Sequence, residues 1–265
     1  MEDIRKMIDN NYTKENGKQI LKDTIYNGIT AQNAEIIDDI KNELTIYSKC
    51  INDEMCPREL ELVYLASVLK NSDLSFTQLL ANSYKNKIQE WNECFIWQGN
   101  DEFNGLINII GKDNSVIDIS DELIKEESYI NKVEKLIKHT PKEVLNNKPV
   151  IFCSYNFLGK YRAELKERYD KCITPELFID GASIIIPDTD IKLIATCAFK
   201  NIPCKGEPII LTSADNIIIG TKLDDEAYFD IQYSEKYDKV DINVRWKNGA
   251  KIESGNLIVR GYSIL

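Results

Sequence analysis

The sequence predicts a mixed α+β fold, with helices concentrated early in the chain and strands concentrated late. Three observations support this prediction. The strongest helical periodicity runs from about residue 75 to 97, short β-branched runs follow Cys172, and polar and apolar residues alternate through 240–247. Because helices and strands do not alternate regularly, a repeating βαβ fold is not expected. The 265 residues suffice for one large domain or two small ones.

The N-terminal part of the chain carries the weakest structural signal. Residues 1–16 are polar and predict an arm. Residues 45–48 (TIYS) favour a strand, whereas a helix over 34–44 is a competing interpretation that periodicity does not decide. Pro57 then suits the first position of a further helix.

The long helix has a clear start and end. Ser75 and Gln78 form a capping box, and Gly99 marks the C-terminal stop. Its apolar residues follow three- and four-residue spacing: Phe76, Leu79, Leu80, Tyr84, Ile88, Trp91 and Phe95. At 1.5 Å per residue it would be about 35 Å long. We expect one stripe of it to pack against the sheet that holds Val244 and Trp246, through Leu80, Ile88, Trp91 and Phe95.

The remainder of the chain predicts two more helices and a series of buried strands. A short apolar stretch covers 103–110. One helix is expected over 121–138, and another from Asn156 with Leu158, Tyr161, Leu165 and Tyr169 on one face. Strands are expected at 149–153, 184–186, 209–211, 217–219, 240–246 and 256–262, with turns at Asn248-Gly249 and Ser254-Gly255.

Composition and charge restrict the function classes. The chain is 43% hydrophobic and 29% charged, which is typical of a globular protein. Its formal net charge is −10, so the basic footprint of a nucleic-acid-binding module is missing. An acidic wall can nevertheless enclose DNA, because repulsion keeps the polymer from adhering to it. Residues 1–6 carry no apolar signal segment, and no apolar run reaches the length of a membrane span, so a soluble, cytoplasmically made protein is expected.

The seven cysteines predict reduced thiols. Their number is odd, they are scattered, and no C-x-x-C occurs. The two close pairs, Cys50 with Cys56 and Cys197 with Cys204, do not have the spacing of a zinc knuckle.

A search for catalytic chemistry finds no convincing set of residues. His139 is the sole histidine and is expected at a helix end, where its cation would meet the helix dipole. Gly159-Lys160 lacks the glycine pattern of a P-loop. The acidic pairs Asp38-Asp39, Glu126-Glu127 and Asp224-Asp225 are typical of solvated faces, and Trp91, Trp97 and Trp246 of core or subunit contacts. We therefore predict no enzyme, and no catalytic, cofactor-binding or metal-binding residues.

An ordered series of short motifs carries a family resemblance. The series comprises 93–100 (ECFIWQGN), 103–106 (FNGL), 141–145 (PKEVL), 150–154 (VIFCS), 161–165 (YRAEL) and 211–223 (LTSADNIIIGTKL). From about residue 45 onward it resembles the major capsid proteins of tailed bacteriophages, which have the Hong Kong 97-type fold. It is most similar to those of crAss-like and related gut phages. Ala214 and Lys222 depart from the family pattern.

The resemblance implies a domain organisation for this chain. Residues 1–16 would be the N-terminal arm and 17–56 the E-loop. Residues 57–140 would form the peripheral domain, with 75–97 as its spine helix. The axial domain would comprise 141–225, and 226–265 would return to the peripheral domain as strands.

The resemblance also implies a structural function. The chain would be a capsid subunit that assembles into pentamers and hexamers of an icosahedral shell around double-stranded DNA. Its partners would be copies of itself, scaffold, portal and possible decoration proteins, and packaged DNA without sequence-specific contacts, with no membrane. It would be assembled in the host cytoplasm and reside in the virion. An encapsulin-type nanocompartment of the same fold is the alternative function.

Overall fold

The computed structural model describes residues 35–38, 44–58, 76–169, 182–200, 206–222 and 228–263. The chain forms two compact units. The first unit comprises Met1–Gly28, Ile37–Trp91 and Gly220–Gly249, and the second comprises Ile29–Ile36, Asn92–Ile219 and Ala250–Leu265. The mixed α+β composition predicted from the sequence is confirmed.

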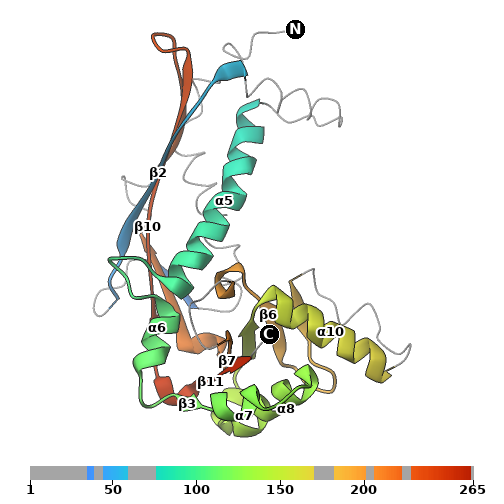
Figure 1. Ribbon diagram of the computed structural model, residues 1–265. Coiled ribbons are helices and arrows are strands. Elements are labelled where there is room, and N and C mark those ends of the chain that lie inside the picture. Colours follow the sequence, from blue (N-terminus) through green and yellow to red (C-terminus); the bar gives the residue numbers. More distant parts are fainter. Residues whose placement is uncertain are drawn as a thin grey trace. The chain divides into compact units, whose positions relative to one another are not determined.

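The first unit is built on a long antiparallel ladder. Strand β10 (Lys239–Ile252) pairs with β2 (Tyr47–Met55) from Val240 opposite Met55 to Asn248 opposite Tyr47, and Figure 1 shows the two strands side by side. Strand β9 (Tyr228–Ser234) pairs with the start of β10. The five-stranded sheet has the order β1-β8-β10-β2, with β1 at Glu35–Asp38 and β8 at Ile217–Lys222.

The alternation predicted for β10 is confirmed, but the strand is longer than expected. Its inward residues Val240, Ile242, Val244 and Trp246 are buried. The turn predicted at Asn248-Gly249 is wrong, because β10 continues through it to Ile252. A Cβ on Gly249 would lie 2.1 Å from the carbonyl oxygen of Thr45, so the glycine allows a close backbone approach. The helix considered over 34–44 is also wrong at Glu35–Asp38, which is a strand.

Helix α5 (Phe76–Gln98) confirms the predicted long helix, and of its predicted buried stripe Ile88 and Phe95 are confirmed, whereas Trp91 is wrong. Trp91 is 56% exposed, whereas Tyr84, Ile88 and Phe95 are buried. At 100° per residue, Trp91 lies about 60° around the axis from Ile88, which places it beyond the edge of the buried stripe. In the first unit the Tyr84 hydroxyl donates to Asp53 on β2, and burial raises the pKa of this tyrosine. Of the helix expected from Pro57, only Pro57 and Arg58 are among the described residues. The predicted burial of Leu80 is not tested, because its side chain lies outside the described part of the chain.

The second unit contains a six-stranded sheet of order β3-β11-β7-β4-β6-β5. The strands are β3 (Ile117–Asp118), β4 (Pro149–Cys153), β5 (Ser183–Ile185), β6 (Lys192–Ala195), β7 (Glu207–Ser213) and β11 (Val259–Ser263). Strand β4 pairs parallel with β6 and antiparallel with β7. All five residues of β4 are buried, as its continuous apolar run predicts.

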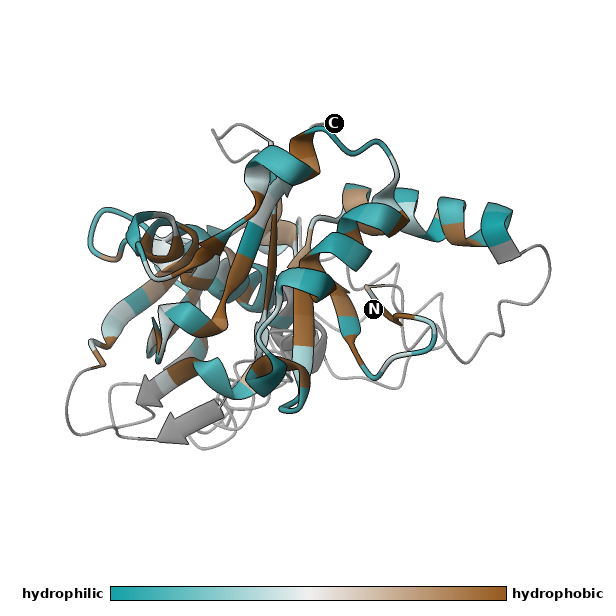
Figure 2. Ribbon diagram, turned by 90° about the horizontal axis from the view of Figure 1, so that it is seen from below, coloured by the Kyte–Doolittle hydropathy of each residue, from teal (hydrophilic) through white to brown (hydrophobic). Residues whose placement is uncertain are grey.

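Helices cover this sheet and complete a single core. They are α6 (Gly105–Lys112), α7 (Ser120–Ile124), α8 (Tyr129–His139), α9 (Lys142–Leu145) and α10 (Tyr155–Tyr169). In Figure 2 the hydrophobic colour concentrates on the strands, and the helices beside them carry more hydrophilic colour. The core cluster joins Phe157, Tyr161 and Leu165 of α10 to Leu136 of α8 and Ile151 of β4. The face predicted for α10 is confirmed at Leu158, Tyr161 and Leu165.

Three segments of this unit differ from the sequence predictions. The apolar stretch 103–110 is largely helix α6. The single helix expected over 121–138 is two helices, α7 and α8, because the chain re-caps at Ser128. The last strand begins at Val259 rather than 256, after the 3₁₀ helix η4 (Gly255–Leu257).

Candidate functional site

The described residues contain no group of three or more histidine, cysteine, aspartate or glutamate side chains placed to hold a metal ion. Within the same ranges, no helix is both long and apolar enough to cross a bilayer. A cavity of about 350 Å³ in the second unit is lined by Leu145, Asn146, Lys148, Pro149, Asp190, Lys192 and Ala214. The Nζ atom of Lys148 lies 3.1 Å from an Asp215 carboxylate oxygen, so this exposed lysine is paired with an acid. The residues of the sequence motifs instead make structural contacts, which fix turns and helix ends in the second unit.

The Gln-Gly-Asn motif forms a tight turn after α5. Gly99 and Gly105 adopt positive φ angles of 80° and 67°. A Cβ on Gly99 would lie 2.1 Å from the Phe103 carbonyl oxygen, and one on Gly105 would lie 2.3 Å from the Gln98 carbonyl carbon. The Asn100 side-chain oxygen accepts a hydrogen bond from the Phe103 backbone N–H at 2.9 Å. The Asn100 backbone N–H donates to the Phe103 carbonyl oxygen at 2.8 Å. Two backbone segments therefore cross where only glycine fits.

Trp97 is the aromatic centre of this motif. It is fully buried, with ring centroids 4.7 Å from Phe152 on β4 and 5.0 Å from Phe199. Phe199 ends the 3₁₀ helix η2 (Cys197–Phe199), and the neighbouring Gln98 amide donates to the Ala198 carbonyl of the same helix. The motif thus joins the end of α5 to the sheet and to η2, as expected for a core contact.

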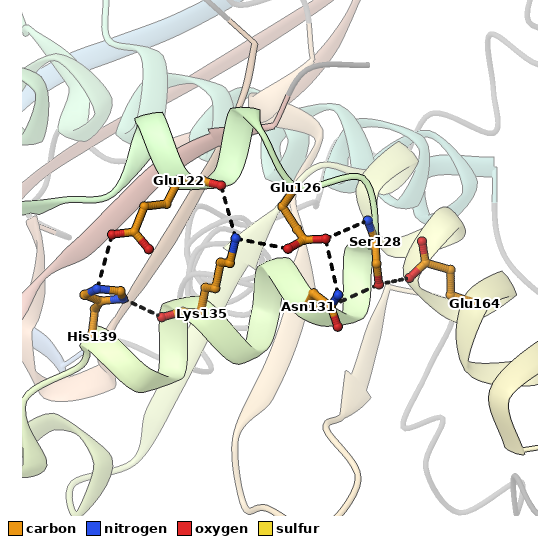
Figure 3. Close-up of polar contacts among 7 residues, drawn as sticks. All are labelled: Glu122, Glu126, Ser128, Asn131, Lys135, His139 and Glu164. Atoms are coloured by element: carbon orange, nitrogen blue, oxygen red, sulfur yellow. Dashed lines mark hydrogen bonds and ion pairs between the residues drawn. The ribbon is translucent and has the colours of Figure 1, made fainter.

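Glu164, from the YRAEL motif, caps helix α8 from a distance in sequence (Figure 3). Its carboxylate accepts from the Tyr129 and Ile130 amides at 2.9 and 3.0 Å and from the Ser128 hydroxyl at 3.0 Å. These amides are donors that the first turn of a helix leaves without internal partners, and a negative charge is favourable there. The cap explains why α8 starts at Tyr129 instead of continuing from α7.

A second group of polar side chains connects α7 with α8 (Figure 3). Glu126 lies 3.0 Å from the Lys135 amine and accepts from the Asn131 amide at 3.2 Å. Hydrogen bonds from Lys135 and Asn131 hold the pKa of Glu126 below its usual range. Glu126 is therefore part of a polar network at the surface of the second unit. His139 ends α8 as predicted, with Nε2 3.4 Å from Glu122 and Nδ1 2.9 Å from the Lys135 carbonyl oxygen.

The Asp-Asn turn between β7 and β8 is also a structural junction. Asn216 is buried, and its amide donates to the Thr212 hydroxyl and to the Ser254 carbonyl, both at 3.0 Å. The Ser254 amide donates back to the Asn216 side-chain oxygen at 2.8 Å. The pair ties this turn to the segment preceding β11. The described residues do not include the acidic pair Asp224-Asp225, nor Asp39 of the pair Asp38-Asp39.

Sequence reasoning did not predict that Lys132 is buried. Lys132 on α8 is 3% exposed, its amine donates to the Ser263 hydroxyl at 2.7 Å, and it lies 4.5 Å from the centre of the Tyr129 ring. Burial lowers its pKa. No neighbouring residue in the sequence marks Lys132 as internal, because its partner Ser263 is 131 positions away.

Comparison with protein-family profiles finds no matching family, and comparison with curated proteins finds no match. Solved structures do match the fold. A chain of the satellite phage P4 procapsid, whose structure includes the size determination protein, aligns with a TM-score of 0.61 at 10% identity, over 94% of this chain and 90% of that chain. A capsid structure of an empty GTA particle aligns at 0.55 and 10% identity, over 88% of this chain and 89% of that chain. A virus-like particle from Pyrococcus furiosus aligns at 0.53 and 11% identity, over 94% and 99%. These matches confirm the predicted Hong Kong 97-type capsid fold, and at such identities they establish the fold alone.

Proposed function

We propose that this chain is a major capsid subunit of a tailed bacteriophage, related to those of crAss-like gut phages. Copies of it would form the pentamers and hexamers of an icosahedral shell that encloses double-stranded DNA. The observation that carries the proposal is the alignment with a procapsid chain over 94% of this chain and 90% of that one. The likeness therefore spans nearly the whole of both aligned chains and is not confined to a part of them.

The charge of the chain supports a container for DNA more than a DNA-binding protein. With a net charge of −10 per subunit, the wall would repel packaged phosphates instead of binding them. We propose that the DNA has no sequence-specific contact with this subunit. Scaffold, portal and possible decoration proteins would be further partners, with assembly in the host cytoplasm and the virion as the final location.

Exposed aromatic side chains are candidates for contacts between subunits. Trp91, Tyr155 and Tyr237 are 56%, 49% and 63% exposed, and they lie on α5, on α10 and in the turn between β9 and β10. Aromatic residues are enriched in protein interfaces, where they contribute a large share of the binding energy. We propose that neighbouring subunits cover these side chains in the shell.

The domain roles remain as the resemblance implied. We propose 1–16 as the arm, 17–56 as the E-loop, α5 as the spine of a peripheral domain over 57–140, 141–225 as the axial domain, and 226–265 as return strands. The compact units divide the chain elsewhere, because α7 and α8 share one core with β4 and α10. Limited proteolysis of the subunit would test which division corresponds to independent bodies.

Light scattering and negative-stain imaging of the purified protein test the proposed function. We expect closed shells, and we expect Trp91→Ala to weaken assembly while leaving the subunit folded. Glu90→Ala, an exposed neighbour on α5, is the matched control and should assemble like the parent. Monomers or dimers alone, in every salt and crowding condition and with scaffold and portal supplied, would refute the proposal.

We expect no covalent cross-links between subunits of the shell. The known isopeptide cross-link of the fold joins an E-loop lysine to a peripheral asparagine, and Lys18, Lys22 and Lys41 could in principle serve. No local sequence feature marks any of these three lysines, which lie outside the described residues. The measurement is electrophoresis after boiling in detergent and reductant, where a ladder of multimers would contradict this prediction.

An encapsulin-type compartment is the alternative function, because the family resemblance implies a fold that encapsulins share. The two functions differ in cargo. Extraction of purified particles should yield protected double-stranded DNA for a phage capsid, whereas an encapsulated protein without nucleic acid would favour the compartment.

A further inference from the structure

Three side chains in the second unit bring two thiols and a carboxylate together. The Cys94 and Cys197 sulfur atoms lie 3.9 Å apart, and the Cys197 thiol donates to a Glu93 carboxylate oxygen at 3.0 Å. Glu93 and Cys94 lie on α5, whereas Cys197 begins η2, which is 103 residues further along the chain than Cys94. Both cysteines are partly exposed, so small reagents can reach them.

The two segments that carry these thiols are fixed to each other by contacts on either side. Gln98 on α5 donates to the Ala198 carbonyl of η2, and the Trp97 ring packs edge-on against Phe199. The sulfur atoms are therefore held near each other by a rigid frame. A disulfide has a sulfur–sulfur distance of about 2.05 Å, so closure from 3.9 Å requires an approach of about 1.9 Å, which side-chain rotation can supply.

We propose that Cys94 and Cys197 are an oxidisable pair that closes into an intramolecular disulfide when the protein meets a small-molecule disulfide such as oxidised glutathione. In the first step a thiolate of the pair attacks one glutathione sulfur, its S–S bond breaks, and one glutathione thiol is released. The second cysteine then loses its proton to solvent and attacks the mixed disulfide, releasing the second glutathione thiol. The protein loses two electrons and two protons, and the oxidant gains both.

The surroundings of Cys197 favour the protonated thiol over the thiolate at neutral pH. Its hydrogen bond with Cys94, its burial and the adjacent Glu93 carboxylate together raise the pKa of the Cys197 thiol. Because the thiolate is the attacking species, closure should be slow at neutral pH and accelerate as the pH rises. Glu93 is thus a positioning residue that keeps the Cys197 thiol protonated. The pair would remain open in a reducing cytoplasm and close after prolonged exposure to an oxidising medium.

The other described cysteines do not share this arrangement. Cys153 is fully buried in β4, and burial raises the pKa of its thiol. Cys50 and Cys56 are exposed in and directly after β2 of the first unit. The sequence paired Cys197 with Cys204 by proximity along the chain, whereas the fold places it beside Cys94.

Peptide mapping of the full-length protein after treatment with oxidised glutathione tests the inference. We expect most chains to contain a peptide pair linked through Cys94 and Cys197, reversed by dithiothreitol. Because the link closes a loop of roughly 100 residues, the oxidised subunit should melt at least about 4 °C higher than the reduced subunit. Cys94→Ser should abolish the linked pair and leave glutathione on Cys197, and Cys50→Ser should retain it.

Recovery of Cys94 and Cys197 as separate glutathione adducts, or linked to other cysteines, would overturn the proposal. The rate of closure provides a second measurement that proximity alone would not change. It should continue to rise between pH 8.5 and 10, where an ordinary thiol with a pKa of about 8.5 already levels off, and a plateau in that range would contradict the role of the raised pKa. Glu93→Gln should close several-fold faster at pH 7.5, provided that its reduced form keeps the parent circular dichroism spectrum; an unchanged rate would count against Glu93. The inference does not depend on the proposed capsid function, because an unassembled subunit would show it equally.

Discussion

Replacement of Trp97 by alanine should be among the most destabilising single changes in the second unit. The Trp97 side chain is fully buried between Phe152 and Phe199. A buried aromatic side chain removes about 150–250 Å² from water, which at roughly 25 cal/mol per Å² corresponds to an upper value of about 4–6 kcal/mol. Alanine retains the Cβ, and the neighbouring rings can relax partly into the cavity. We therefore expect Trp97→Ala to lower the free energy of unfolding by about 3–5 kcal/mol.

Urea denaturation of the unassembled subunit, followed by circular dichroism, measures this loss without relying on the deleted fluorophore. Trp91→Ala is the matched control, because Trp91 is on the same helix but 56% exposed, and it should cost less than about 1 kcal/mol. The reasoning would be refuted if Trp97→Ala unfolded within about 1 kcal/mol of the parent. A loss for Trp91→Ala as large as for Trp97→Ala would equally contradict the assigned buried face.

Two further predictions use paired variants of the second unit. Gly105→Ala should lower the free energy of unfolding by at least about 2 kcal/mol, because the φ angle of Gly105 is 67° and a Cβ there would meet the Gln98 backbone. Gly159→Ala on α10 should raise it by about 0.5–1 kcal/mol, because a Cβ at Gly159 would enter open space. Thermal unfolding of both variants measures the difference. Glu126 has a lowered pKa in the folded state, so its stabilising contribution exists above its ordinary pKa and is lost as the pH falls through the folded value. Glu126→Gln should therefore be less stable than the parent at pH 6, and the two stabilities should converge as the pH falls in acid unfolding experiments. The control Glu127→Gln should match the stability of the parent at every pH. A stability difference between Glu126→Gln and the parent that does not change with pH would contradict the coupling of stability to the protonation of Glu126.

Local patterns predicted the elements whose burial follows from their own sequence. The apolar run 149–153 and the alternating run 240–246 form strands β4 and β10. A strand that is buried on both faces shows a continuous apolar run, and a strand that is buried on one face shows alternation, so each pattern is visible in the local sequence. The long helix was located for a similar reason, through its capping residues and the spacing of its apolar side chains.

Errors arose where a distant residue decided the local structure. Helix α8 begins at Tyr129 because Glu164, 35 positions away, accepts its first amides, and the periodicity of 121–138 contains no trace of that carboxylate. The burial of Trp97 instead of Trp91 depends on which sides of α5 are enclosed, which helical spacing does not specify. Cys94 and Cys197 meet only because the fold closes a loop between them.

In the second unit, helix termini and turns have partners within the same chain, such as Glu164 on the α8 amides and Asn216 on Thr212 and Ser254. These internal hydrogen bonds hold the core without the help of another molecule. The side chain of Trp91, by contrast, is 56% exposed, and a surface that covered it would add hydrophobic contact there. We therefore expect Trp91→Ala to weaken the proposed assembly and to leave folding intact, because only an assembled neighbour would bury the exposed part of this side chain.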